Sequence, residues 1–186
     1  MLFDLVRIEL NLEMAATPEM IRIASKTKPE MVTLVPEKRQ ELTTEGGLDV
    51  KANRKQLMRA IASLHRAGIP VSLFINPDPE DIRTSKDIGA DMVEIHTGMY
   101  ADAPRNKIQR ELNRVAIAVD AAHVSGITVN VGHGLNYHNV QAVTMLDGIR
   151  GLYIGHSIIS RAVLTGLEAA VREMKSIIQS CVHLKK

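Results

Sequence analysis

The sequence contains few aromatic residues: they make up 3% of its 186 positions, and tryptophan is absent. A core with this composition must consist of Ile, Leu, Val, Ala and Met, which suits parallel sheets covered by helices. There is one cysteine, Cys181, so an internal disulfide is excluded and no Cys/His spacing indicates a zinc site. We therefore expect a protein of the reducing cytoplasm that holds no metal.

Long hydrophobic runs are missing too. The longest uncharged apolar runs have about 5 to 8 residues, which is the length of a strand, so no segment is expected to cross a bilayer. Residues 1–4 lack the basic start and long apolar core of a signal peptide. The 23 Lys and Arg residues nearly balance the 21 Asp and Glu residues and form no basic patch interleaved with aromatics. These absences argue against membrane, secreted and nucleic-acid-binding proteins.

Short β-branched runs alternate with longer helical patterns along the whole chain. The predicted strands are Arg7–Glu13, Met31–Pro36, Pro70–Ile75, Met92–His96, Thr128–Gly132 and Leu152–Gly155. Each one precedes a stretch with apolar residues at spacings of three and four, most clearly on one face between Leu164 and Cys181. Strand–helix units in succession imply parallel strands. The chain is therefore predicted to form a single α/β domain over residues 1–186.

Two architectures fit this alternation: an open doubly wound sheet and a (β/α)₈ barrel. No G-x-G-x-x-G turn opens a helix, which weakens the dinucleotide-binding interpretation of the first. A barrel has eight strands and typically about 250 residues, so the predicted units in this chain are about two too few. The pattern alone leaves both open, and a barrel would lack its N-terminal quarter.

One connection is much longer than the others. Residues 37–53, with the sequence EKRQELTTEGGLDVKAN, form a polar segment after the second predicted strand. Long strand-to-helix loops in compact domains are usually functional lids or disordered segments. We predict that residues 37–53 are an active-site lid with a hinge at Gly46 and Gly47.

Polar residues cluster where the predicted strands end, which is where barrels place their active sites. In chain order they are Asn11 and Glu13, Thr33 and Glu37, Asn76 and Asp78, Glu94 and His96, Asn130 and His133, and Gly155 and His156. One acid at a strand end is more often a helix cap or a surface ion pair, but six such ends favour an active site. Glu13 and Glu94 are candidates for proton transfer, because burial near another carboxylate raises a glutamate pKa toward neutrality. His133 would titrate in the working range unaided.

Two segments that contain glycine predict phosphate binding. In residues 129–139 Gly134 follows His133, and glycine allows backbone N–H groups to approach a ligand closely. The alternative for this segment is a glycine turn with a satisfied histidine. Gly155 and His156 end the last predicted strand and open a helix, where free N–H groups and the helix dipole attract an anion. In barrels the phosphate commonly lies after the last two strands.

At these segments the sequence resembles the pyridoxine 5′-phosphate synthase family of the deoxyxylulose-dependent vitamin B6 route. The matching blocks are LNLEMAAT (Leu10–Thr17), VTLVPEKRQELTTEGGLDV (Val32–Val50), VSLFINPDP (Val71–Pro79), EIHTGMYADA (Glu94–Ala103), VNVGHGLNYHNV (Val129–Val140) and YIGHSIISRAV (Tyr153–Val163). They follow the family order over nearly the whole chain. The resemblance implies a (β/α)₈ barrel that assembles into a homo-octamer and uses no metal or organic cofactor. It also implies condensation of 3-amino-2-oxopropyl phosphate with 1-deoxy-D-xylulose 5-phosphate to give pyridoxine 5′-phosphate, phosphate and water.

The same resemblance implies roles for individual residues. Glu13 matches the general acid/base glutamate, Glu94 a second acid near the reacting carbons, and His133 a histidine that assists proton transfer. The residues that it places around the substrate phosphates or in the closing loop are Gly134, Gly155, His156 and Thr43. A closing lid would keep water away from reactive imines.

The chain departs from the family pattern at its start. The family begins with two further strands, which end in Asn-x-Asp-His and His-x-Arg patterns, and residues 1–9 of this chain (MLFDLVRIE) contain neither. We therefore expect about six of the eight strand–helix units. One alternative is an inactive phosphate-binding relic or an assembly partner of a full-length synthase. Another is a different phosphosugar barrel enzyme, although no strand-end lysine is available for the Schiff base of an aldolase.

Overall fold

The computed structural model of this chain describes residues 5, 7–37 and 46–184. In this part of the chain, six strands form one sheet in which every neighbouring pair is parallel. They are β1 (Asn11–Met14), β2 (Met31–Leu34), β3 (Val71–Ile75), β4 (Met92–His96), β5 (Thr128–Gly132) and β6 (Ile149–Tyr153). The helices are α2 (Pro18–Thr27), α3 (Arg54–Arg66), α4 (Pro79–Asp87), α5 (Gly98–Ala101), α6 (Ile108–Ser125), α7 (Val140–Thr144), α8 (His156–Thr165) and α9 (Leu167–Leu184).

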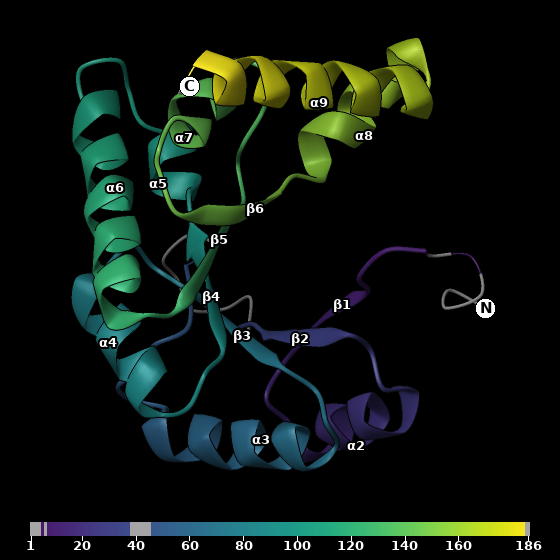
Figure 1. Cartoon of the computed structure of the whole chain (residues 1–186), viewed down its shortest axis with the longest axis vertical. Coiled ribbons are helices and arrows are strands. Elements are labelled where there is room, and N and C mark those ends of the chain that lie inside the picture. The colour runs from purple at the N-terminus through teal and green to yellow at the C-terminus, as the bar shows by residue number, and fades with distance from the viewer. Residues whose placement is uncertain (1–4, 6, 38–45, 185–186) are drawn as a thin grey trace.

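The sheet is of the barrel type. Its strands lie in chain order from β1 to β6, whereas a doubly wound sheet reverses its order at a switch point. The strands curl, and the helices follow the outside of the curve from α2 and α3 through α4 and α6 to α8 and α9 (Figure 1). The predicted partial (β/α)₈ fold with six strand–helix units is confirmed, and the doubly wound alternative is wrong.

Alternation along each strand separates an apolar outer face from a polar inner face. In β3, Val71, Leu73 and Ile75 belong to the hydrophobic core, while Ser72 lies on the other face of the sheet. The outer face packs against helices such as α3, whose Leu57, Ala60, Ile61 and Leu64 are buried. Burial of one such leucine contributes about 1.5–3 kcal/mol. The core therefore lies between sheet and helices, and the inner face is left for polar side chains.

Two helices begin with a capped N-terminus. Thr17 precedes α2 and its Oγ1 accepts a hydrogen bond of 3.2 Å from the Met20 N–H. Asp78 precedes α4 and its Oδ1 accepts a hydrogen bond of 2.8 Å from the Glu80 N–H. Proline occupies the start of both helices, where its missing N–H costs nothing. For Asp78, the helix-cap alternative is therefore the correct one.

The two edge strands differ from their predicted bounds. β1 begins at Asn11 and not at Arg7, and β6 covers Ile149–Tyr153 and not Leu152–Gly155. In the described residues each of these strands pairs on one side only, so fewer contacts fix its limits. An ion pair joins Glu9, just before β1, to Arg150 in β6. This pair links the two ends of the curled sheet.

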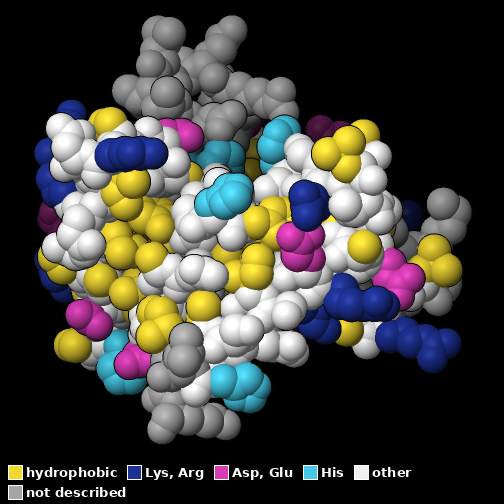
Figure 2. Space-filling view, turned by 90° about the horizontal axis from the view of Figure 1, so that it is seen from above, with side chains coloured by type: hydrophobic (Ala, Val, Ile, Leu, Met, Phe, Trp, Pro, Cys, Tyr) yellow, Lys and Arg dark blue, Asp and Glu magenta, His cyan; other side chains and the backbone are white. Residues whose placement is uncertain are grey.

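The helices near β6 leave apolar side chains in solvent. α8 has no buried residue, and Val163 and Leu164 are 81% and 82% exposed. Seen from the α8 and α9 side, hydrophobic side chains gather over part of the surface (Figure 2). The predicted continuous apolar face from Leu164 to Cys181 is partly wrong, because Gly166 (φ 82°) separates α8 from α9. Cys181 is buried as predicted, whereas Leu164 is not.

Candidate active site

A cavity of about 1850 Å³ lies at the inner face and carboxyl ends of the strands. The predicted site residues that line it are Glu13, Glu94, His133, Gly134, Gly155 and His156. They belong to β1, β4 and the segments that follow β5 and β6, so the fold brings together residues far apart in the sequence. Thr43 lies outside the described residues.

Glu94 is the most deeply buried acid of the cavity. Its side chain is 4% exposed, and its Oε1 lies beside Gly132 of β5, where a Cβ atom would come within 2.4 Å of it. Burial, and next the charge of Glu13, raise the pKa of Glu94 to about 8. Near neutral pH this carboxyl is therefore largely protonated and can donate a proton.

Glu13 provides the contrasting carboxyl. It lies on the edge strand β1, opposite Thr33 of β2, and its side chain is exposed. Its charge contributes to the raised pKa of Glu94 across the cavity. Two carboxyls in such different environments suit a pair in which one group donates a proton and the other accepts one.

His133 is held in an uncommon backbone conformation directly after β5. Its φ of 72° and that of Gly134, 82°, are both left-handed, and Thr97 Oγ1 donates hydrogen bonds to the carbonyls of Gly132 (2.7 Å) and His133 (2.6 Å). The His133 ring lies 4.8 Å from the ring of His96. Strained backbone that its surroundings hold in place is typical of functional sites.

The start of α8 lies at one end of the cavity. Gly155 is the N-cap residue, and a Cβ atom there would meet no heavy atom within 4 Å. Ser157 Oγ donates a hydrogen bond of 2.8 Å to the carbonyl of Leu135, which ties this helix start to the loop after β5. Exposed N–H groups at a helix N-terminus favour an anion such as a phosphate.

The C-terminal part of the predicted lid is packed onto β3. The Gly47 N–H donates to Asn76 Oδ1 (3.0 Å), and the Leu48 N–H donates to the carbonyl of Phe74 (2.8 Å). Leu48 and Val50 are buried in the core. Residues 46–53 are thus anchored, while residues 38–45 of the predicted lid lie outside the described part of the chain.

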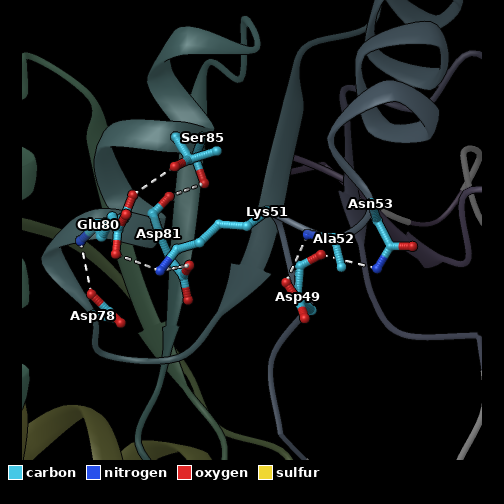
Figure 3. A network of polar contacts seen from close by, with 9 residues as sticks. Asp49, Lys51, Ala52, Asn53, Asp78, Glu80, Asp81 and Ser85 are labelled. Atoms are coloured by element: carbon cyan, nitrogen blue, oxygen red, sulfur yellow. Dashed lines mark hydrogen bonds and ion pairs between the residues drawn. The ribbon is translucent and has the colours of Figure 1, made fainter.

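A polar network at the rim fixes the same segment to α4 (Figure 3). Lys51 Nζ lies 2.6 Å from Glu80 Oε2 and 3.7 Å from Asp81 Oδ1. The hydrogen bond that Lys51 donates to Glu80 is the main cause that raises the pKa of Lys51, and burial is the main cause that raises the pKa of Asp81. Asp49 Oδ1 accepts a 2.9 Å hydrogen bond from the Ala52 N–H. Since two carboxylates already engage Lys51, we interpret this network as an anchor.

Tyr153 of β6 also lines the cavity and was missed as a candidate. Its pKa is raised by burial and next by the charge of Glu94. Its position at the end of β6, two residues before Gly155, is the signal that could have found it.

No group of three or more His, Cys, Asp or Glu side chains in residues 5, 7–37 and 46–184 is arranged to hold a metal ion. Within the same residues, no helix combines the length and the apolar character needed to span a membrane.

Comparison with known proteins links this cavity to one family. Residues 1–180 match the model of a family described as pyridoxal phosphate biosynthesis protein PdxJ. The chain is 59% identical over 181 residues to the pyridoxine 5′-phosphate synthase of Thermodesulfovibrio yellowstonii, which covers 97% of this chain and 75% of that protein. It is 56% identical over 175 residues to the synthase of Trichlorobacter lovleyi, covering 94% of this chain and 73% of that protein. These matches extend over nearly every residue that builds the cavity, and the chain belongs to the PdxJ family.

Proposed function

We propose that this chain acts as a pyridoxine 5′-phosphate synthase, which condenses 3-amino-2-oxopropyl phosphate with 1-deoxy-D-xylulose 5-phosphate. The observation that supports it best is the pair of unlike carboxyls, buried Glu94 and exposed Glu13, at one cavity. The products are pyridoxine 5′-phosphate, phosphate and water. The synthases of Thermodesulfovibrio yellowstonii and Trichlorobacter lovleyi bear that name.

Acid/base groups are sufficient for this chemistry. An amine and a ketone form an imine with loss of one water molecule. Enolisation and phosphate elimination follow by proton transfers, and ring closure to the aromatic pyridine expels a second water molecule. In this scheme neutral Glu94 donates protons to departing oxygens, Glu13 removes protons from carbon, and His133 relays them. The raised pKa of Glu94, about 8, places its proton in the working range.

The phosphate groups of the substrates are assigned to the other end of the cavity. Gly155 and His156 at the start of α8, with Gly134 after β5, offer backbone N–H groups and an imidazole. Residues 46–53 are anchored, so Thr43 and the part of the predicted lid that precedes them would close over the bound substrates and exclude water. We place this activity in the cytoplasm and expect the chain to form a homo-oligomer.

A second candidate function is assembly with a full-length synthase. The exposed apolar side chains of α8, Val163 and Leu164 among them, favour it, because large apolar surfaces often mark protein interfaces. Co-purification with a full-length synthase would support this candidate. A monodisperse chain that turns over substrate alone would argue against it.

A turnover assay tests the proposed function. The purified chain is mixed with both substrates, beside a full-length synthase as positive control, and pyridoxine 5′-phosphate is measured. We expect product that Glu13→Ala abolishes, and that Glu19→Gln, an exposed acid on α2 away from the cavity, leaves unchanged. No product with an active control would contradict the proposal, and phosphate binding without turnover would then favour the inactive relic.

A further inference from the structure

Asn130 of β5 is a completely buried amide. Its side chain is 0% exposed, and within the part of the chain that the structure describes neither Oδ1 nor Nδ2 has a hydrogen-bond partner. Native structures seldom leave a buried polar side chain without a partner, so such a group indicates an interaction that the fold provides in some state. Asn130 has no role in the function proposed above.

The position of Asn130 in the sheet gives the direction of its amide. Asn130 is the register partner of Glu94 in β4 and of Gly151 in β6, so its side chain shares the inner face with Glu94. A Cβ atom at Gly151 would lie 2.9 Å from Asn130 Oδ1 and 3.7 Å from its Cγ. The oxygen therefore lies toward β6. The NH₂ group lies on the other side of Cγ from this oxygen, away from Gly151 and so on the side of β4, the strand that carries Glu94.

Glu94 presents a matching acceptor. Its Oε1 lies over Gly132, and its Oε2, buried, also has no hydrogen-bond partner in the described residues. A donor and an acceptor thus lie on register partners of adjacent strands, about 4.8 Å apart in the hydrogen-bonding direction of a sheet. We expect rotation about the side-chain bonds of the two residues to bring this donor and this acceptor together.

We propose that Asn130 is a positioning residue for Glu94, its amide donating a hydrogen bond to Glu94 Oε2 when that carboxyl is ionised. This inference rests on the proposed role of Glu94 in proton transfer. The titratable groups that face Glu94 are Glu13 from β1, Tyr153 from β6, His96 on the same strand and His133 after β5. Asn130 is uncharged, and the hydrogen bond that it donates offsets part of the free-energy cost of ionising the buried Glu94 carboxyl. It also returns the carboxyl to one orientation after each proton transfer.

The test is a titration that needs no turnover. The side-chain carboxyl carbons of glutamate are labelled with ¹³C, the Glu94 signal is assigned by its loss in Glu94→Gln, and its pKa is followed by NMR in the intact chain. Asn130→Leu keeps a similar side-chain volume and removes the donor, so the pKa of Glu94 should rise by about one pH unit. Ser72→Ala is the matched control, because Ser72 is also buried on the inner face without a hydrogen-bond partner in the described residues, yet its register partners are Thr33 and Met92. In Ser72→Ala the Glu94 signal should titrate with the same pKa as in the wild type.

A second variant keeps the test valid if Asn130→Leu does not fold. Asn130→Asp has nearly the same shape, and a second carboxyl facing Glu94 should raise the pKa of Glu94 by more than one pH unit. An unmoved pKa in either folded variant, or an equal shift in Ser72→Ala, would overturn the inference. The titration does not depend on activity. A chain that is inactive, but whose Glu94 pKa rises as expected in the Asn130 variants, would therefore refute only the proposed function. A chain that is active, but whose Glu94 pKa is the same in the Asn130 variants as in the wild type, would refute only the role of Asn130.

Discussion

The middle of the sheet and its two edges are built differently. Strands β2 to β5 have a neighbour on each side, and helices α3, α4 and α6 cover their outer face with buried aliphatic side chains. In the described residues β1 and β6 each have one neighbour, and α8 beside β6 buries none of its side chains. We call the first region the closed wall and the second the open side.

The proposed site uses both regions, and each supplies what the other cannot. The closed wall holds Glu94 and Asn130 out of solvent, and that burial is the main cause of the raised pKa of Glu94. The open side supplies Glu13, Gly155 and His156, all exposed to an incoming substrate. We therefore assign the control of protonation to the buried wall and the binding of substrate phosphate to the accessible rim.

The largest expected difference between the closed wall and the open side is in the effect of a leucine-to-alanine substitution on the free energy of unfolding. Leu64→Ala, at a fully buried position of α3, should lower the free energy of unfolding by about 2–5 kcal/mol, because it removes contacts and leaves a cavity. Leu164→Ala in α8, where the side chain is 82% exposed, should change it by less than about 0.5 kcal/mol. Denaturant unfolding measures both. Equal decreases in the free energy of unfolding of the two variants would contradict the proposed difference in packing between the closed wall and the open side.

Glu94→Gln should stabilise the protein and change its pH dependence. The folded-state pKa of Glu94, about 8, lies above its ordinary value of 4.5, so folding favours the neutral form. The resulting penalty is absent below about pH 4.5, grows as the pH rises, and is complete above about pH 8. Replacement by the neutral amide should therefore raise the free energy of unfolding at pH 7 by up to about 3 kcal/mol.

Unfolding measured from pH 4 to pH 9 checks this second expectation. Glu19→Gln, an exposed acid on α2, is the control and should leave the pH dependence of the wild type in place. A Glu94→Gln protein with the stability of the wild type at every pH would mean that Glu94 pays no penalty for its burial.

His156→Ala is the smallest expected effect and belongs to the open side. If His156 contacts bound phosphate, its loss should weaken the binding of inorganic phosphate by at least about tenfold, since hydrogen bonds to charged groups contribute about 1.5–3 kcal/mol. His138→Ala removes an exposed histidine that does not line the cavity and should bind as the wild type does. Isothermal titration calorimetry gives both affinities. Equal affinities for phosphate in the two variants would show that His156, at the start of α8, does not contact the bound phosphate.

The closed wall was also the part of the fold that the sequence predicted best. The apolar runs at β2 to β5 place those strands within two residues of their observed limits, because buried parallel strands have continuous hydrophobic runs. β1 and β6 were misplaced, since an edge strand has fewer partners to fix its ends. The break at Gly166 was missed because the apolar spacing of three and four continues across it.

The site shows a similar division. Strand-end polarity found the acids, the histidines and the glycines of the cavity, but it could not separate Asp78, a helix cap that does not line the cavity, from the residues of the site. The pairing of Asn130 with Glu94 depends on strand register, and no local pattern in one sequence encodes register.

The most direct test of this account is the protonation state of Glu94 in the wild-type chain. Infrared difference spectra between wild type and Glu94→Gln isolate the carbonyl stretch of its neutral carboxyl across a pH series. We predict that this band is present at pH 6 and disappears with a midpoint at about pH 8, as expected for a carboxyl buried in the closed wall and facing Glu13. A midpoint near the ordinary value of 4.5 would show that Glu94 is ionised at neutral pH, and it would contradict the proposed proton donor.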